Sequence, residues 1–224
     1  MSTIEIPSPA PNSRIHANTL NFGSHKYKES DYFPLLYISS GYNVNGISYI
    51  YVYRIMRNGK RTDFSISLVQ TISLINFGKW TEGIIDAENN YLWVKSEKGG
   101  KNTYTKYVLP EFSNNQVSIY YENSLDNIVI DVCPPKSSGQ GHLFHGGKIY
   151  FVSGVPSRNQ PLYLRTINTV TGEWDFSLNL ADIGLVDSRD NKRNSFEPEG
   201  VLFYKGKLMI CYRKALYILD IKKK

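Results

Sequence analysis

The fold is decided by the stretch "TEGIIDAENNYLWVKS", which runs from Thr81 to Ser96. Two other stretches align with it without gaps over their first half, "GQGHLFHGGKIYFVSG" at 139–154 and "PEGVLFYKGKLMICYR" at 198–213. The glycines that match are separated by 58 and 59 residues: Gly83, Gly141 and Gly200. In each copy two apolar runs flank a short polar turn, so the sequence predicts a β-hairpin that recurs along the chain.

A fourth copy near the N-terminus is looser, because an insertion separates its two runs, "HANTLNFG" at 16–23 and "FPLLYISSG" at 33–41. Third strands are expected in all four units, at 48–55, 103–109, 161–168 and 215–221. Fourth strands are expected in three units only, at 63–72, at 173–180, and at either 117–121 or 128–132. Two-residue turns are expected at three hairpins: Asn89-Asn90, Gly146-Gly147 and Lys205-Gly206.

Repeated units of four antiparallel strands predict an all-β protein, a β-propeller with four recognisable blades in a single domain over residues 1–224. The spare strand "STIEIP" at 2–7 would pair with the last unit and close the ring. The units are longer than the ~40–50 residues of typical propeller repeats. Extra length at 122–138 and 181–196 therefore leaves a five-bladed ring as an alternative. A third possibility is that an N-terminal blade is missing and that 2–7 is the remnant of its last strand.

The composition is that of an ordinary globular protein, with 224 residues, 41% hydrophobic and 21% charged, and a net charge of +6. The positive residues are spread along the chain, which favours a solvated surface over a nucleic-acid interface. No apolar run approaches the roughly 18 residues of a membrane span. The N-terminus does not resemble a signal peptide, so we expect a cytoplasmic protein, or an extracytoplasmic one if the natural N-terminus is missing. We also expect a monomer.

The two cysteines, Cys133 and Cys211, form no CxxC or Cys/His cluster, which argues against structural zinc. Cys211 lies in the apolar run "LMICY" and is expected to be a buried thiol. Whether the two form a disulfide stays open.

Polar residues stand at the start of each first strand, where an inner strand would face the central channel. These candidate ligand-binding residues are His16, Asn18, Trp80, Glu82, Gln140, His142, Glu197 and Glu199. Their convergence would suit a cation, a sugar or another small polar ligand. The alternative is structural, since the polar ends of crowded strands also need hydrogen-bond partners.

Three segments carry a resemblance to bacterial propellers of the lactonase-like and glutamine-cyclotransferase-like kinds: 82–94, "QGHLFHGGKIYFVSG" at 140–154 with "LYLRTINTVTG" after it, and "EPEGVLFYKGKLMI" at 197–210. The lactonase resemblance implies a central Ca²⁺ held by a Glu before an inner strand, and Glu82 and Glu199 occupy such corners. "HANTLNFG" and "FPLLY" also resemble uncharacterised propellers of gut Bacteroidetes, which implies the fold and no activity.

Two functions follow as hypotheses. The first is a propeller that binds a small polar ligand or a protein partner at the channel mouth, since no catalytic motif is visible. The second is an enzyme, either a metal-assisted lactone or ester hydrolase or a glutaminyl-cyclotransferase-like acyl transferase. In that case Glu82 or Glu199 would act as general acid or base.

Overall fold

The computed structural model describes residues 6, 19–41, 43, 45–59, 63–113, 116–131, 139–183, 197–212 and 215–219. The predicted closing strand at 2–7, of which only Ile6 is described, therefore lies outside this part of the chain, as do His16, Asn18 and Cys133. The chain forms two compact units, Met1–Ile128 and Val129–Lys224, which are described in turn.

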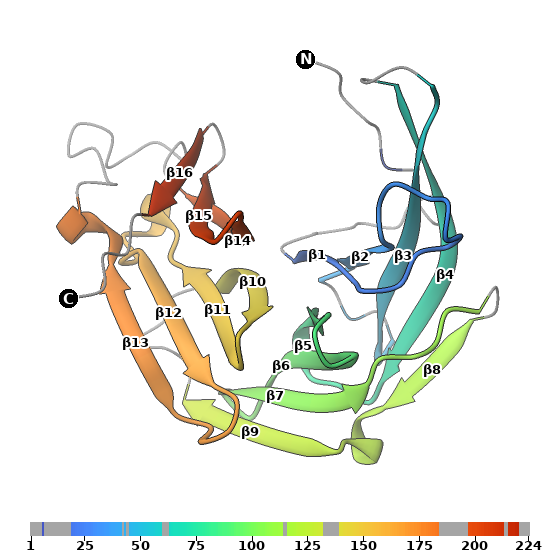
Figure 1. Ribbon diagram of the computed structural model, residues 1–224. Helices are drawn as coiled ribbons and strands as arrows, with labels where there is room; N and C mark the ends of the chain where they lie inside the picture. Colours follow the sequence, from blue (N-terminus) through green and yellow to red (C-terminus); the bar gives the residue numbers. More distant parts are fainter. Residues whose placement is uncertain are drawn as a thin grey trace. The chain divides into compact units, whose positions relative to one another are not determined.

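The protein is all-β, and its four sheets are the blades of a four-bladed β-propeller. Figure 1 labels the strands of each sheet. The described residues contain no α-helix, and none of their helical turns is long or apolar enough to cross a membrane. Three short 3₁₀ turns lie in the described residues: η1 (Tyr121–Asn123), η2 (Pro156–Arg158) and η3 (Leu180–Ile183). The four-blade prediction from the repeats is confirmed.

The first sheet has the order β1-β2-β3-β4-β8. Its strands are β1 (Leu20–Phe22), β2 (Leu36–Ser39), β3 (Ile47–Arg57), β4 (Phe64–Ile75) and β8 (Val117–Tyr120). The first four strands are antiparallel neighbours, as the sequence predicts. β8 is a fifth strand that pairs parallel to β4, with Val117 opposite Ile72. The interpretation of 117–121 as the last strand of the second unit is therefore wrong.

The second sheet has the order β5-β6-β7-β9. Its strands are β5 (Lys79–Asp86), β6 (Tyr91–Lys98), β7 (Lys101–Val108) and β9 (Asp126–Asp131). The other prediction for the fourth strand, 128–132, is the correct one. Part of the extra length at 122–138 is thus used to reach β9 after β8 has paired with the first sheet.

The remaining two sheets belong to the second unit, with orders β10-β11-β12-β13 and β14-β15-β16. Their strands are β10 (Gly139–His145), β11 (Lys148–Ser153), β12 (Tyr163–Asn168), β13 (Trp174–Asn179), β14 (Pro198–Tyr204), β15 (Lys207–Tyr212) and β16 (Ala215–Leu219). In the described residues the last sheet has three strands, as the repeat alignment predicts.

Two of the three predicted hairpin turns are confirmed. Gly146-Gly147 and Lys205-Gly206 connect directly paired residues, and all four have positive φ, as a two-residue turn of this kind requires. The turn at Asn89-Asn90 is longer than predicted, because Asp86 pairs with Tyr91 and four residues lie between them. The Asp86 carboxylate accepts hydrogen bonds from the backbone N–H groups of Glu88 and Asn89, which stabilises the wider loop.

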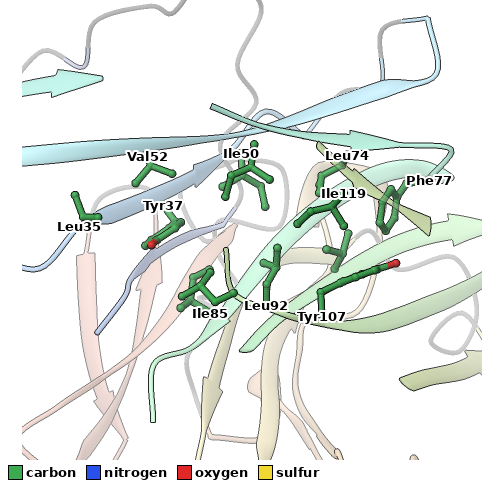
Figure 2. Close-up of a cluster of buried hydrophobic side chains, with 13 residues drawn as sticks. Leu35, Tyr37, Ile50, Val52, Leu74, Phe77, Ile85, Leu92, Tyr107 and Ile119 are labelled. Carbon is green, nitrogen blue, oxygen red and sulfur yellow. The ribbon is translucent and has the colours of Figure 1, made fainter. Parts of the chain in front are cut away.

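Each unit has its own hydrophobic core. In the first unit a cluster of buried side chains lies between the first and second sheets, and Figure 2 shows Ile50 of β3 beside Ile85 and Leu92 of the second sheet. In the second unit a cluster that includes Val152, Leu164, Val201 and Ile210 joins the third and fourth sheets.

The first core predicts a difference between two glycines that match in the repeats. A Cβ atom at Gly83 would lie 2.4 Å from Ile50 Cδ1, whereas at Gly200 the nearest atom would be the Cys211 Cβ at 3.9 Å. We expect Gly83→Ala to lower the free energy of unfolding by about 1–3 kcal/mol through overpacking. Gly200→Ala serves as the matched control and should change it by less than about 0.5 kcal/mol. Denaturant unfolding of both variants checks this, and equal losses would contradict the packing role of Gly83.

Candidate functional site

The corner that the repeats share is a β-bulge in the first strand of three of the sheets. A bulge places one extra residue in a strand and turns the side chains beside it, which is why bulges are common near binding sites. The register shifts between Lys79 and Glu82 in β5, between Gly139 and His142 in β10, and between Pro198 and Gly200 in β14. These bulges contain or adjoin most of the predicted site residues: Trp80, Glu82, Gln140, His142 and Glu199.

In the first unit Glu82 is buried, and both of its carboxylate oxygens have a partner. The side chain is 2% exposed. The Thr19 hydroxyl donates a hydrogen bond to Oε2 at 2.5 Å, and Lys95 Nζ lies 3.6 Å from Oε1. Lys95 stands directly opposite Glu82 on β6, and its ammonium also donates to the carbonyl oxygen of Trp80 at 3.3 Å. A buried carboxylate is therefore matched by a buried ammonium and a hydroxyl.

These contacts connect three parts of the first unit. The Glu82–Lys95 ion pair joins β5 to β6, and the Thr19 hydrogen bond joins β5 to the segment that leads into β1. A general acid or base must reach substrate or solvent, and this carboxylate is enclosed by its partners. The contacts of Glu82 are therefore those of a residue that stabilises the bulge and not those of a residue that transfers protons.

The outer edge of β5 is bonded to side chains of the first sheet. The Gly83 N–H donates to Ser39 Oγ at 2.7 Å, and the Ile85 N–H donates to Asn21 Oδ1 at 3.0 Å. Gly83 and Ile85 are two residues apart, so both N–H groups point to the same edge of the strand. Side chains of the first sheet therefore satisfy the backbone donors on this edge of β5.

Trp80 lies in the bulge with its side chain 43% exposed and a backbone φ of 52°. This left-handed conformation is unfavourable for residues with a Cβ atom, and glycine or asparagine normally adopts it. Among the described non-glycine residues with positive φ, Trp80 is the only aromatic one; the others are Asn45, Asn76, Asn90, Asn159 and Lys205. The bulge therefore presents a tryptophan ring where the backbone would favour glycine.

In the second unit, the Gln140 side-chain amide donates to Glu197 Oε1 at 2.8 Å. Two residues of the predicted site are thus in direct contact, and they connect β10 to the residue before β14. His142 is 2% exposed and stacks on Phe151 at a ring distance of 5.4 Å, so it packs within the sheet. Glu199 is partly buried within the bulge of β14.

The structure thus brings together Trp80 with Glu82, and Gln140 with Glu197. Sequence reasoning missed the partners of Glu82 and of the β5 edge, which are Thr19, Asn21, Ser39 and Lys95. Lys95 left a signal, since it is a charged residue inside the apolar run "YLWVKS". The others are small polar residues more than 40 positions from their partners, and nothing local in the sequence marks such contacts.

Within the described ranges no group of three or more His, Cys, Asp or Glu side chains is placed to hold a metal ion. The calcium site expected at Glu82 and Glu199 stays a prediction. Cys211 is a free thiol that is half-buried rather than fully buried as expected, and burial raises its pKa. Its side chain lies on the face of the last sheet opposite Ile210, which enters the core.

The chain matches no protein-family model and has no significant sequence similarity to a curated protein. The resemblance to lactonase-like, glutamine-cyclotransferase-like and Bacteroidetes propellers therefore stays a prediction.

The buried ion pair generates a prediction about stability. We expect Glu82→Gln to lower the free energy of unfolding by about 3 kcal/mol, because Lys95 would stay buried without a counter-charge. The double variant Glu82→Gln/Lys95→Met should recover a large part of that loss, since it removes both charges. Denaturant unfolding of the single and double variants measures the difference.

Asp175→Asn is the matched control for that experiment. Asp175 pairs with Lys148 at the surface of the third sheet, where solvent screens the charges. Asp175→Asn should lower the free energy of unfolding much less than Glu82→Gln does. If the two single variants were equally stable, the buried pair would not determine the stability of the first unit.

Proposed function

We propose that the protein is a ligand-binding propeller and that Trp80 is the side chain that contacts the ligand. The observation that carries this proposal is an exposed tryptophan held in a left-handed backbone conformation. Such strain persists only where the surrounding structure fixes it, and it concentrates at binding and active sites. A stable fold alone would be served better by glycine at this position.

The groups around Trp80 explain how the strain is maintained. Lys95 Nζ donates to the Trp80 carbonyl oxygen, and Glu82 fixes the ammonium of Lys95 from the other side. Next to Trp80 in the same bulge, the Thr81 hydroxyl donates to the carbonyl oxygen of Gly78 at 3.0 Å. The tryptophan backbone is thus held at several points while the ring stays accessible.

The chemistry of the site favours a small polar ligand with a flat apolar face, such as a sugar ring. An indole ring provides a large rigid surface for stacking at low conformational cost. Lys79, the preceding residue on β5, is exposed, and its ammonium can donate hydrogen bonds to ligand oxygens. The enzyme alternative has less support, because the Glu82 carboxylate, one of the two expected to act as general acid or base, is already engaged by Thr19 and Lys95.

Tryptophan fluorescence tests this function with a panel of neutral mono- and disaccharides: glucose, galactose, mannose, maltose and cellobiose. We expect at least one sugar to change the emission of the wild type in a saturable way. The Trp80→Gly variant should show no such change, and Trp174→Phe, which removes an exposed tryptophan of the other unit, should retain it. A wild type that responds to none of these sugars, or a Trp80→Gly variant that responds equally, would refute the proposal.

The strain itself is tested by stability, without any ligand. Trp80→Ala and Trp80→Gly both remove the ring, but only glycine relieves the left-handed backbone. We therefore expect the glycine variant to be more stable than the alanine variant by about 1–2 kcal/mol. Denaturant unfolding of the two variants measures this gap. An alanine variant of equal or greater stability would show that the backbone at this position is not strained.

A further inference from the structure

The second unit contains a buried arginine for which no described residue provides a counter-charge. Arg165, on β12, is 3% exposed. Among the residues that the structure describes, no carboxylate forms an ion pair with its guanidinium, and Nη1 has no hydrogen-bond partner. Burying a cation without a counter-charge costs several kcal/mol, and buried charges are normally paired, so this guanidinium is a candidate ligand for an anion.

The guanidinium is held in place by neutral neighbours. Its Nε donates a hydrogen bond to Ser177 Oγ at 3.2 Å. The guanidinium carbon lies 4.1 Å from the centre of the Tyr163 ring and 5.7 Å from that of Trp174. These contacts orient the planar fork and leave part of its hydrogen-bonding capacity unused.

A second buried polar group lies on the same face of the sheet. Ser153 is fully buried, and its hydroxyl has no hydrogen-bond partner in the described part of the chain. Ser153 pairs with Tyr163 across β11 and β12, and Phe151 pairs with Arg165. Ser153 and Arg165 are therefore diagonal neighbours on one face, with Cβ atoms about 7–8 Å apart. The Ser153 hydroxyl and Arg165 Nη1 are thus two neighbouring donors that have no acceptor among the described residues.

We propose that this face of the third sheet binds a small oxyanion, with Arg165 as its main ligand and Ser153 as a second donor. Guanidinium groups bind carboxylate and phosphate oxygens through paired hydrogen bonds, so both classes of anion suit the site. The site lies close to solvent, because Ser177 and Trp174 on β13, the last strand of this sheet, are both exposed. The proposal is independent of Trp80, which belongs to the other unit.

Thermal unfolding in matched buffers tests this site. At pH 7 and equal ionic strength, the unfolding midpoint is measured in sodium chloride, sodium phosphate and sodium acetate. A bound anion raises the midpoint progressively with its concentration. We expect a rise in phosphate, in acetate or in both, and the one that acts identifies the class of anion. Equal midpoints in all three salts would overturn the proposal.

Variants separate this site from general effects of salts on stability. Arg165→Met should lose the rise, whereas Lys148→Met, which removes an exposed cation of the same sheet, should retain it. Ser177→Ala, at an exposed position, keeps Arg165 but removes the anchor of Nε, and it should reduce the rise. If Arg165→Met does not fold, Ser177→Ala decides the matter. A rise that survives at full size in Arg165→Met or in Ser177→Ala, or that disappears in Lys148→Met, would refute the assignment.

Discussion

The N–H groups on the outer edge of β5 face no neighbouring strand in the described sheets, and side chains of the first sheet satisfy them instead. Ser39 accepts from Gly83 and Asn21 accepts from Ile85. An edge strand with unpaired donors is a site of aggregation and costs stability if it is buried. Bonding the edge to side chains rather than to another strand lets two sheets pack face to face without merging into one.

Other features of the first unit depend on this contact. Because the backbone of β5 approaches the first sheet closely, no Cβ fits at Gly83 against Ile50. The bulge that precedes Gly83 places Glu82 in the interior, and the carboxylate then requires Lys95 and Thr19 as partners. Lys95 in turn holds the carbonyl oxygen of Trp80, which connects the packing of the core to the tryptophan that we propose as the ligand contact.

The repeats made most of the fold predictable, because turn chemistry and strand alternation are local. Gly146-Gly147 and Lys205-Gly206 demand a tight hairpin wherever they occur. The parallel pairing of β8 with β4 was not predictable, since it depends on the first sheet having an available edge. The wider loop before Tyr91 was missed because it depends on how the Asp86 side chain bonds to the backbone.

For the candidate site, the sequence predicted only that polar residues stand at the start of the first strand of each repeat. Alignment identified Trp80, Glu82 and Gln140, but the bulges that give these corners their geometry are set by strand register rather than by residue type. The contact between Gln140 and Glu197 joins residues 57 positions apart, and the ion pair of Glu82 needed a lysine that looked like a break in an apolar run. Arg165 carries no local signal, because it lies inside the predicted strand 161–168 and belongs to no motif.

Amide hydrogen exchange at Gly83 and Ile85 tests the central claim most directly. If the side chains of Ser39 and Asn21 satisfy this edge, both N–H groups should exchange slowly, at rates comparable to those of paired amides in β6. In the variant Asn21→Ala/Ser39→Ala both should exchange much faster, while amides in the third sheet stay unchanged. Rapid exchange at Gly83 and Ile85 in the wild type, or protection that persists in the double variant, would contradict the account.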